Sequence, residues 1–283
     1  MAGFTRIKTF GDAFESGKTL TSTFRKAPAQ ANNAGWYDLS MTAGNPPPNY
    51  YAATPLEATT LEYFKGILHG DNKSPEKKFL TNIELTGTIA GMVGEYRLLD
   101  YLLFYPFVDG DELSAQAMVN TTPLPRYTAG TGVQAMLVGV TPSLGGGTFT
   151  FNYTNQDGAA KTSPAINCSS AAQLIGTIAT GPAAVAGSSF GPFLPLAAGD
   201  SGIRSVESVT FTVAAGALYS LVLVKPLLTH AIREINIPNE NNLVRQTPFL
   251  PEVVDGAYLN LIVNAASTLS GGFLIGNTTY AWS

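Results

Sequence analysis

Few residues in this chain have the types and the spacing that catalysis needs, and the first candidate is the segment "GDAFESGKTL" at residues 11–20. Gly17 and Lys18 resemble the end of a phosphate-binding loop, where backbone N–H groups surround one phosphate and a lysine reaches the next. That loop has the spacing G-x-x-x-x-G-K, whereas here five residues separate Gly11 from Gly17. Asp12 would also repel the phosphates. The segment therefore predicts a solvated turn and no nucleotide site.

A second candidate is the segment "GDSG" at residues 199–202, which resembles the nucleophile segment of chymotrypsin-like proteases. Such chemistry needs a histidine base that lies against the serine. The chain contains two histidines, His69 and His230, and neither lies in a matching sequence context. A hydrolase with Ser201 as nucleophile and His230 as base is therefore an alternative hypothesis, and the favoured prediction is that the chain is not an enzyme.

Metal and carboxylate chemistry has one candidate segment, "VDGDEL", which contains Asp109, Asp111 and Glu112. Acidic residues at this spacing bind calcium in some loops, and paired carboxylates hydrolyse glycosides. The segment lacks the glycine and the distal glutamate of an EF-hand, so we expect a solvated loop. The single cysteine, Cys168, has no neighbour that marks a nucleophile, and we expect an inert thiol. The sequence predicts no catalytic residue, no cofactor and no metal.

The composition points instead towards association. Charged residues make up 13% of the 283 residues, against roughly 25% in an average soluble domain. No apolar run reaches about 18 residues, and no secretory signal is visible, so we expect no membrane contact. The net charge of −4 leaves no basic field for nucleic acid. Because surfaces poor in charge tend to associate, we expect much of the exterior to be covered by partners.

Residues 1–48 are turn-rich and polar, and we interpret them as an extended N-terminal arm. The arm ends at Pro46-Pro47-Pro48, which favours polyproline geometry. Aromatic side chains bring much apolar area with few rotatable bonds, so aromatic residues on or beside an arm are candidates for subunit contacts. The candidates here are Phe4, Phe10, Trp36, Tyr37, Tyr50 and Tyr51.

Residues 49–283 are expected to form one β-rich body. Thr54, Gly70 and the apolar spacing between them predict a helix over residues 55–70. The apolar segment "EYRLLDYLLFYPFVDGDE" is either a short helix or a buried strand, and Pro106 is expected to end it. The small-residue-rich stretch around residues 169–200 is expected to be an insertion on one edge.

Alternation of apolar and polar residues strengthens from Gly132 onwards. In "GGGTFTFNYTNQDG" the residues Phe149, Phe151 and Tyr153 fall on one face, and "DG" predicts a turn. In "SVESVTFTV" a slip in the alternation at Ser208 predicts a bulge. Roughly eight to ten short strands separated by turns favour a mainly β fold, an antiparallel sandwich or jelly roll with one or two short helices.

Several segments resemble virion structural proteins of tailed bacteriophages. They are "WYDLSMTAGNPPPNYYAATPL", "LLDYLLFYPFVD", "LPRYTAGTGVQ", "FTFNYTNQDG", "GDSGIRSVESVTF", "LYSLVLVKPL" and "DGAYLNLIV". The resemblance implies a capsid-bound decoration (cement) subunit, or another head or tail component, in a virion assembled in the host cytoplasm. It implies a homo-oligomer such as a trimer, with a major capsid protein as partner, and it supplies no catalytic residues. We expect the arm to lie across a neighbouring subunit, as an added strand does.

One further alternative stays open from the residues. Jelly rolls often bind sugars at exposed aromatic side chains, so a receptor- or glycan-binding fibre or tail component is the runner-up hypothesis.

Overall fold

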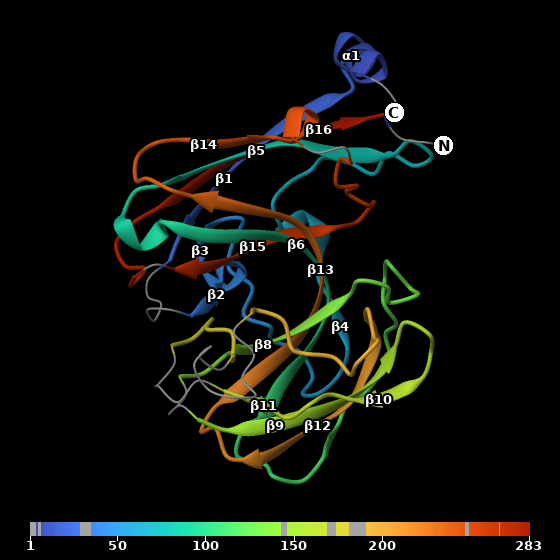
Figure 1. The fold of residues 1–283 in the computed structure, drawn as a ribbon, viewed down its shortest axis with the longest axis vertical. Coiled ribbons are helices and arrows are strands. Elements are labelled where there is room, and N and C mark those ends of the chain that lie inside the picture. The colour runs from blue at the N-terminus through green and yellow to red at the C-terminus, as the bar shows by residue number, and fades with distance from the viewer. Residues whose placement is uncertain are drawn as a thin grey trace.

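The computed structural model describes residues 4, 7–28, 35–142, 146–168, 174–180, 191–246, 249–265 and 267–283. Its regular structure is mainly antiparallel strands in three sheets, which confirms the prediction of a mainly β, sandwich-like fold. A central sheet lies between two outer sheets, with the chain termini at one end of the molecule (Figure 1). We call the outer sheets the terminal sheet, which contains strands from both chain ends, and the aromatic sheet.

The terminal sheet has five strands in the order β14-β5-β16-β1-β3. These are β14 (Asn239–Asn242), β5 (Lys78–Gly87), β16 (Leu274–Trp282), β1 (Thr19–Ala27) and β3 (Ala43–Asn45). The two short α-helices, α1 (Ile7–Glu15) and α2 (Leu243–Gln246), lie beside this sheet.

Strand β1 is interior to the terminal sheet, which differs from the extended arm expected over residues 1–48. It pairs with β16 on one side and with β3 on the other. Its buried Phe24 lies opposite Gly276, where a Cβ atom would come within 2.1 Å of the phenylalanine ring. The glycine therefore makes room for an aromatic ring across the strands. Alternation in "TLTSTF" is the local signal for this strand, and the arm interpretation missed it.

The aromatic sheet contains five strands, of which four follow the order β10-β9-β12-β7. They are β10 (Ala160–Thr162), β9 (Thr148–Asn155), β12 (Ile203–Val213), β7 (Gln116–Ala117) and, paired with β9, β11 (Ile166–Asn167). The alternation predicted for β9 is confirmed, because Phe149, Phe151 and Tyr153 are all buried. The bulge predicted near Ser208 is also confirmed, as a register shift between Val206 and Ser208.

The central sheet follows the order β2-β15-β6-β13-β8, with β4 paired to β6. The strands are β2 (Trp36–Asp38), β15 (Tyr258–Ala265), β6 (Gly94–Asp109), β13 (Leu218–Ile232), β8 (Gln134–Gly139) and β4 (Thr59–Thr60). Strands β6 and β13 are long enough to pack against both outer sheets (Figure 1). Leu98 on β6 packs in the cluster shared with the terminal sheet, and Tyr105 on β6 packs in the cluster shared with the aromatic sheet.

Residues 176–179 close this sheet on itself. The Asp38 N–H donates to Gly176 O (2.8 Å) on one side, and the Gly139 N–H donates to Thr177 O (2.9 Å) on the other. The segment therefore joins the edge strands β2 and β8, and the ring of strands becomes a small barrel. Small barrels are filled by side chains. The interior cluster comprises Trp36, Met41, Tyr51, Leu99, Tyr101, Phe104, Met136, Val138, Ile178, Val222, Val224, Tyr258 and Ile262.

The segment around residues 169–200, expected as an edge insertion, is described only over 174–180 and 191–200. In those parts it contributes to the core, because Ile178 lies in the barrel interior and Leu194 packs in the aromatic cluster. Residues 169–173 and 181–190 lie outside the described residues.

Pro106 does not end its element, contrary to the expectation from sequence. Strand β6 continues to Asp109, and the pairing with β13 shifts register between Tyr219 and Leu221, opposite this proline. Phe107 adopts a positive φ of 58°, and Pro106 O accepts from the Leu56 N–H. A bulge accommodates a residue that cannot donate to the ladder. The choice left open for this segment is settled as a buried strand.

The helix predicted over residues 55–70 is also wrong. The segment contains β4 and a short 3₁₀ turn, η2 (Tyr63–Lys65). Its backbone groups pair with distant strands instead, because the Ala58 N–H donates to Val119 O and the Ile67 N–H to Leu259 O. A Cβ atom at Gly66 would lie 2.9 Å from Leu259 O, so this close approach needs a glycine. Two further 3₁₀ turns are η1 (Leu39–Met41) and η3 (Ala90–Met92).

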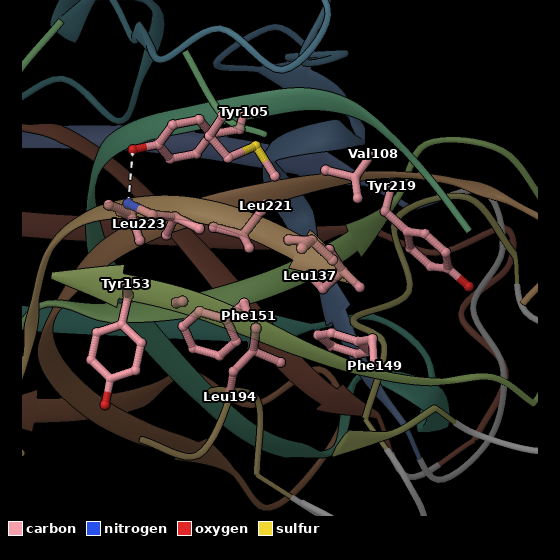
Figure 2. Packing of buried hydrophobic residues seen from close by; sticks show 14 of the residues in the cluster. Tyr105, Val108, Leu137, Phe149, Phe151, Tyr153, Leu194, Tyr219, Leu221 and Leu223 are labelled. Carbon is pink, nitrogen blue, oxygen red and sulfur yellow. Dashed lines mark hydrogen bonds between the residues drawn. The ribbon is translucent and has the colours of Figure 1, made fainter. Parts of the chain in front are cut away.

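The core of the aromatic side lies between the aromatic sheet and one half of the barrel. Figure 2 shows Phe149, Phe151 and Tyr153 in a row along β9, with Leu137 and Leu221 facing them. Rings of β9 and β12 also contact each other, with Phe149 and Phe211 centroids 5.2 Å apart. This arrangement buries the apolar face that the alternation predicted.

Candidate binding site

The phosphate-loop segment has the wrong order of elements for that chemistry. Gly11 lies inside helix α1, and Gly17, with φ of 70°, makes the turn into strand β1. A phosphate loop runs from a strand into a helix, whereas this turn runs from a helix into a strand. Lys18 forms an ion pair with Glu76. The turn therefore connects two elements and has no free cation for a phosphate.

The protease-like segment has a structural role. Asp200 accepts hydrogen bonds from the Tyr153 hydroxyl (2.6 Å) and from Asn155 Nδ2 (2.8 Å), which tie the loop to β9. The Ser201 N–H donates to Gln156 Oε1. His230 lies on β13, where Nε2 contacts Asn239 O of the terminal sheet at 3.0 Å. The structure does not bring the serine and the histidine together.

The acidic segment forms a loop whose carboxylates bind backbone N–H groups. Asp109 Oδ1 accepts from the Asp111 N–H, Asp111 Oδ1 from the Gly216 N–H and Glu112 Oε1 from the Ser114 N–H. Within the part of the chain that the structure describes, no three His, Cys, Asp or Glu side chains gather in a way that could hold a metal ion.

Cys168 is buried, and burial raises the pKa of its thiol to about 12. The thiolate is the reactive form of cysteine, so a thiol with such a pKa is unreactive near neutral pH.

The six aromatic contact candidates divide into three groups. Trp36, Tyr37 and Tyr51 are buried, with exposed fractions of 3%, 7% and 0%. Tyr50 is the opposite, with 63% of its surface exposed. Phe4 and Phe10 are half-buried.

Phe4 and Phe10 belong to an aromatic cluster around helix α1. The Phe4 ring lies 5.5 Å from the rings of both Phe10 and Phe79, and Phe10 lies 5.1 Å from Phe14. Phe14 is 50% exposed. A pocket of about 320 Å³ adjoins the cluster and is lined by Phe10, Phe14, Thr81, Asn82, Asn242, Val244, Arg245 and Thr279. Helix α1 lies at one extremity of the molecule (Figure 1).

A buried carboxylate lies inside the barrel. Asp38 accepts hydrogen bonds from the hydroxyls of Tyr51 (2.5 Å) and Tyr101 (2.7 Å), and from both the N–H and the hydroxyl of Ser40. Burial raises the pKa of Asp38 despite these donors. The same carboxylate raises the pKa of Tyr51, after burial itself. The network fixes Tyr51 pointing inwards, and so fixes the backbone from which Asn49 and Tyr50 extend.

A second buried carboxylate, Asp100, is paired with a cation. Arg126 donates to it from Nε (2.9 Å) and from Nη2 (2.7 Å), and the Tyr258 N–H donates to Asp100 Oδ1 (3.0 Å). Burial raises the pKa of Asp100 to about 6, and Arg126 offsets part of that rise. This pair fixes the start of β15, where Tyr258 begins the strand.

Tyr258 lines a surface pocket, which we call the Asn49 pocket, and Tyr51 lies in the sequence between two of its lining residues, Asn49 and Ala52. Its volume is about 450 Å³. The lining comprises Pro47, Pro48, Asn49, Ala52, Thr59, Thr60, Leu61, Glu62, Lys65, Phe104 and Tyr258. Apolar and polar residues from four separate segments of the described chain converge in this pocket. We therefore treat it as the candidate binding site.

The sequence predicts subunit contacts at Tyr50 and Tyr51, and it does not predict a pocket here. The proline run and Tyr50 were the available signals. Asn49, Leu61, Phe104 and Tyr258 carry no local signal of a site, because strand pairing alone brings them together.

Within the described residues, neither α-helix has the length or the apolar character to cross a membrane. Comparisons of the chain with family models, with curated proteins and with solved structures found no match.

Proposed function

We propose that this chain is a structural subunit of a tailed-bacteriophage virion, a capsid-bound decoration or cement protein that joins its neighbours through helix α1. The observation that carries the proposal is the placement of α1. The helix precedes β1, lies at the extremity of the terminal sheet, and leaves Phe14 half exposed beside a pocket (Figure 1). An amphipathic helix held by one aromatic cluster is suited to bridging two subunits.

The outer faces of the two outer sheets support the same role. They carry hydroxyl and amide side chains that bond to one another across strands, such as Thr21 with Thr279 and Asn152 with Ser208. Charges such as Glu84 and Glu207 are interspersed among these polar groups, and faces with few charges associate more readily than densely charged ones, because fewer like charges repel. The proposed assembly is a symmetric homo-oligomer such as a trimer on a major capsid protein, in a virion assembled in the host cytoplasm.

The proposed contact is narrower than an arm that covers residues 1–48. Strand β1 fills the middle of this chain's own sheet, and β2 forms part of the barrel. The segment that remains for a neighbour is the one before Thr19. Repeated modest contacts of this kind stabilise a shell through multivalency.

A chain that lacks residues 2–16 tests the proposal, because the deletion removes α1 and leaves β1 intact. We expect the truncated chain to keep its cooperative thermal transition and to lose self-association in sedimentation velocity. It should also no longer bind purified particles of the phage that encodes it.

Phe14→Ser should weaken both interactions in the same direction, and Tyr50→Ser is the matched control, an exposed aromatic residue distant from α1 in the sequence. Undiminished self-association and particle binding by the truncated chain would contradict the proposal.

A further inference from the structure

The Asn49 pocket has the size and the shape of a small-molecule site. Its volume of about 450 Å³ lies within the range of roughly 300–1,000 Å³ that is usual for ligand pockets. Its walls come from the proline segment, from β4 and the η2 turn, from β6 through Phe104 and from β15 through Tyr258. We propose that this pocket binds a neutral saccharide, with one sugar ring inside it.

The apolar part of the lining suits the C–H face of a sugar ring. Pro47, Pro48 and Leu61 present aliphatic surface, whereas Phe104 and Tyr258 line the pocket but are almost fully buried in the barrel interior. Two exposed aromatic residues adjoin lining residues in sequence, Tyr50 next to Asn49 and Phe64 next to Lys65, with exposed fractions of 63% and 57%. Exposed rings beside a pocket offer further stacking area to a longer saccharide.

The polar part of the lining has a hydrogen-bonding group without a partner. Asn49 Oδ1 accepts from the Tyr51 N–H (3.3 Å), which sets the orientation of the amide and leaves Nδ2 with no acceptor. Tyr258 also lines the pocket, but its ring belongs to the barrel interior, so the unpartnered amide nitrogen of Asn49 is the donor on which the site rests. An unsatisfied buried polar group costs about 1–3 kcal/mol, so a ligand oxygen that accepts from Asn49 Nδ2 gains affinity.

The charges of the pocket select a neutral ligand. Glu62 and Lys65 form an ion pair with each other at the edge of the site, so neither charge is left for a ligand. A phosphate or a carboxylate would need an unpaired cation, and a lipid chain would leave Asn49 Nδ2 without an acceptor. A polyhydroxylated ring offers that acceptor.

The wall of the pocket is rigid before any ligand binds. Tyr51 and Leu56, on either side of lining residue Ala52, both adopt positive φ values, of 51° and 60°. Residues other than glycine rarely adopt this backbone conformation, and it persists only where the surrounding contacts enforce it. The Tyr51 hydroxyl bond to Asp38 is such a contact. A preformed site loses less conformational entropy on binding.

The test uses the full chain and a panel of neutral mono- and disaccharides, namely glucose, galactose, mannose, N-acetylglucosamine, maltose and lactose. Binding is followed by calorimetry and by amide chemical shifts. We expect at least one sugar to bind at millimolar concentration and to shift the signals of residues 47–65. Asn49→Asp keeps the acceptor for Tyr51 and removes the donor, and should weaken binding about tenfold or more.

Thr60→Arg is a second variant, because a long side chain at this lining position fills the pocket, and it should abolish binding. Asn152→Asp, on the exposed face of β9, is the matched control and should bind as the unaltered chain does. The thermal transition of each variant shows that it is folded.

Three results would overturn the saccharide site: no shift with any sugar of the panel, equal binding by Asn49→Asp and Thr60→Arg, or stronger binding of glucose 6-phosphate or a polyproline peptide. The α1 truncation measures self-association and particle binding, and neither depends on the saccharide experiments. The saccharide site and the virion role can therefore fail separately.

Discussion

The two sides of the central barrel are both sandwiches, yet they bury different chemistry. The interface with the aromatic sheet is made of rings and aliphatic side chains, and none of its described members is a buried charged residue. On the other side, two lysines are buried under the terminal sheet, Lys26 and Lys78, with exposed fractions of 0% and 1%. His69 is buried beside Lys78.

The difference follows from how each side is connected. The aromatic sheet contains a hairpin, β9–β10, and β9 also pairs with β12. The backbone carbonyls of these strands therefore accept hydrogen bonds from N–H groups of neighbouring strands. The terminal sheet joins the two ends of the chain, and loops pass under it. Lys26 Nζ donates to Pro46 O (2.9 Å), and Lys78 Nζ donates to Asp71 O (2.8 Å). Buried loop carbonyls need donors, and a lysine supplies several at once.

The comparison teaches where this protein responds to pH. Burial lowers the pKa of both lysines to about 8, and burial, followed by the nearby Lys78 charge, lowers the pKa of His69 to about 4. The aromatic side has no buried charged group within the described residues. Among the described buried charged groups, those of the terminal side and the barrel should therefore make stability depend on pH, whereas Cys168 on the aromatic side, with its pKa raised to about 12, contributes only in alkali.

The largest expected effect is on the aromatic side. Phe151→Ala removes a buried ring whose centroid lies 5.2 Å from that of the Tyr153 ring (Figure 2). The substitution should lower the free energy of unfolding by about 3–5 kcal/mol. The loss should be equal at pH 6 and pH 9, as measured by urea denaturation. A loss that differs between the two pH values would break the comparison.

Next is Arg126→Ala in the barrel, which leaves Asp100 buried without its cation. Breaking a buried pair in this way costs about 3 kcal/mol at pH 8. The pKa of Asp100 is raised from 3.8 to about 6 in the fold. Its protonation therefore stabilises the fold, and this contribution is complete below about pH 4 and is lost as the pH rises through 6.

Without Arg126 that pKa rises further, so the penalty relative to the unaltered chain should shrink at pH 4.5. Denaturation at both pH values measures the difference. A penalty that grows in acid would contradict the assignment.

A smaller effect is expected from Lys26→Met on the terminal side. The pKa of Lys26 is about 8 in the fold and 10.5 in the unfolded chain, so the unfolded chain binds more protons between these values. From pH 8 to pH 10, Lys26 should therefore contribute a gain in stability of at most about 2–3 kcal/mol, while the buried thiol of Cys168, with its pKa raised to about 12, acts in the opposite direction.

Lys26→Met should remove that part of the gain, with Lys78 still contributing in the same direction. Lys77→Met, an exposed lysine paired with Glu252, is the matched control and should keep the full slope. An unchanged slope in Lys26→Met would show that the buried lysine is not the source.

The smallest effect is expected on the outer face of the same strand that carries Phe151. Asn152→Ala removes an exposed bond to Ser208 and should change the free energy of unfolding by less than about 0.5 kcal/mol. A loss as large as that of Phe151→Ala would show that the outer face, and not the ring core, holds the aromatic sheet.

Local patterns in the sequence predicted the strands well where both faces of a strand have constant environments. The alternation of β9 and β12, and the slip at Ser208, were read correctly because one face is buried and the other is solvated along the whole strand. The apolar spacing of residues 55–70 predicted a helix for the same kind of reason, and failed because Ile67 and Ala58 pair with distant strands. Tertiary pairing overrides a weak local preference.

The candidate site lay further beyond local reasoning. The type of Tyr50 predicts a contact residue, but its exposure and the burial of Tyr51 next to it follow from the bond between Tyr51 and Asp38 inside the barrel. The types of Trp36 and Tyr37 predict arm anchors, but both residues lie in strand β2, which pairs with β15.

The sequence by itself determined that the chain folds as antiparallel strands with aromatic faces, and that its candidate catalytic motifs have the wrong spacing, because both depend on neighbouring residues. Only the tertiary structure decided that residues 176–179 close a barrel, that the N-terminal segment belongs to the sheet, and that Asn49 and Tyr258 share a pocket. These features join residues far apart in the chain, and backbone pairing between strands depends on the whole set of available edges rather than on any local period.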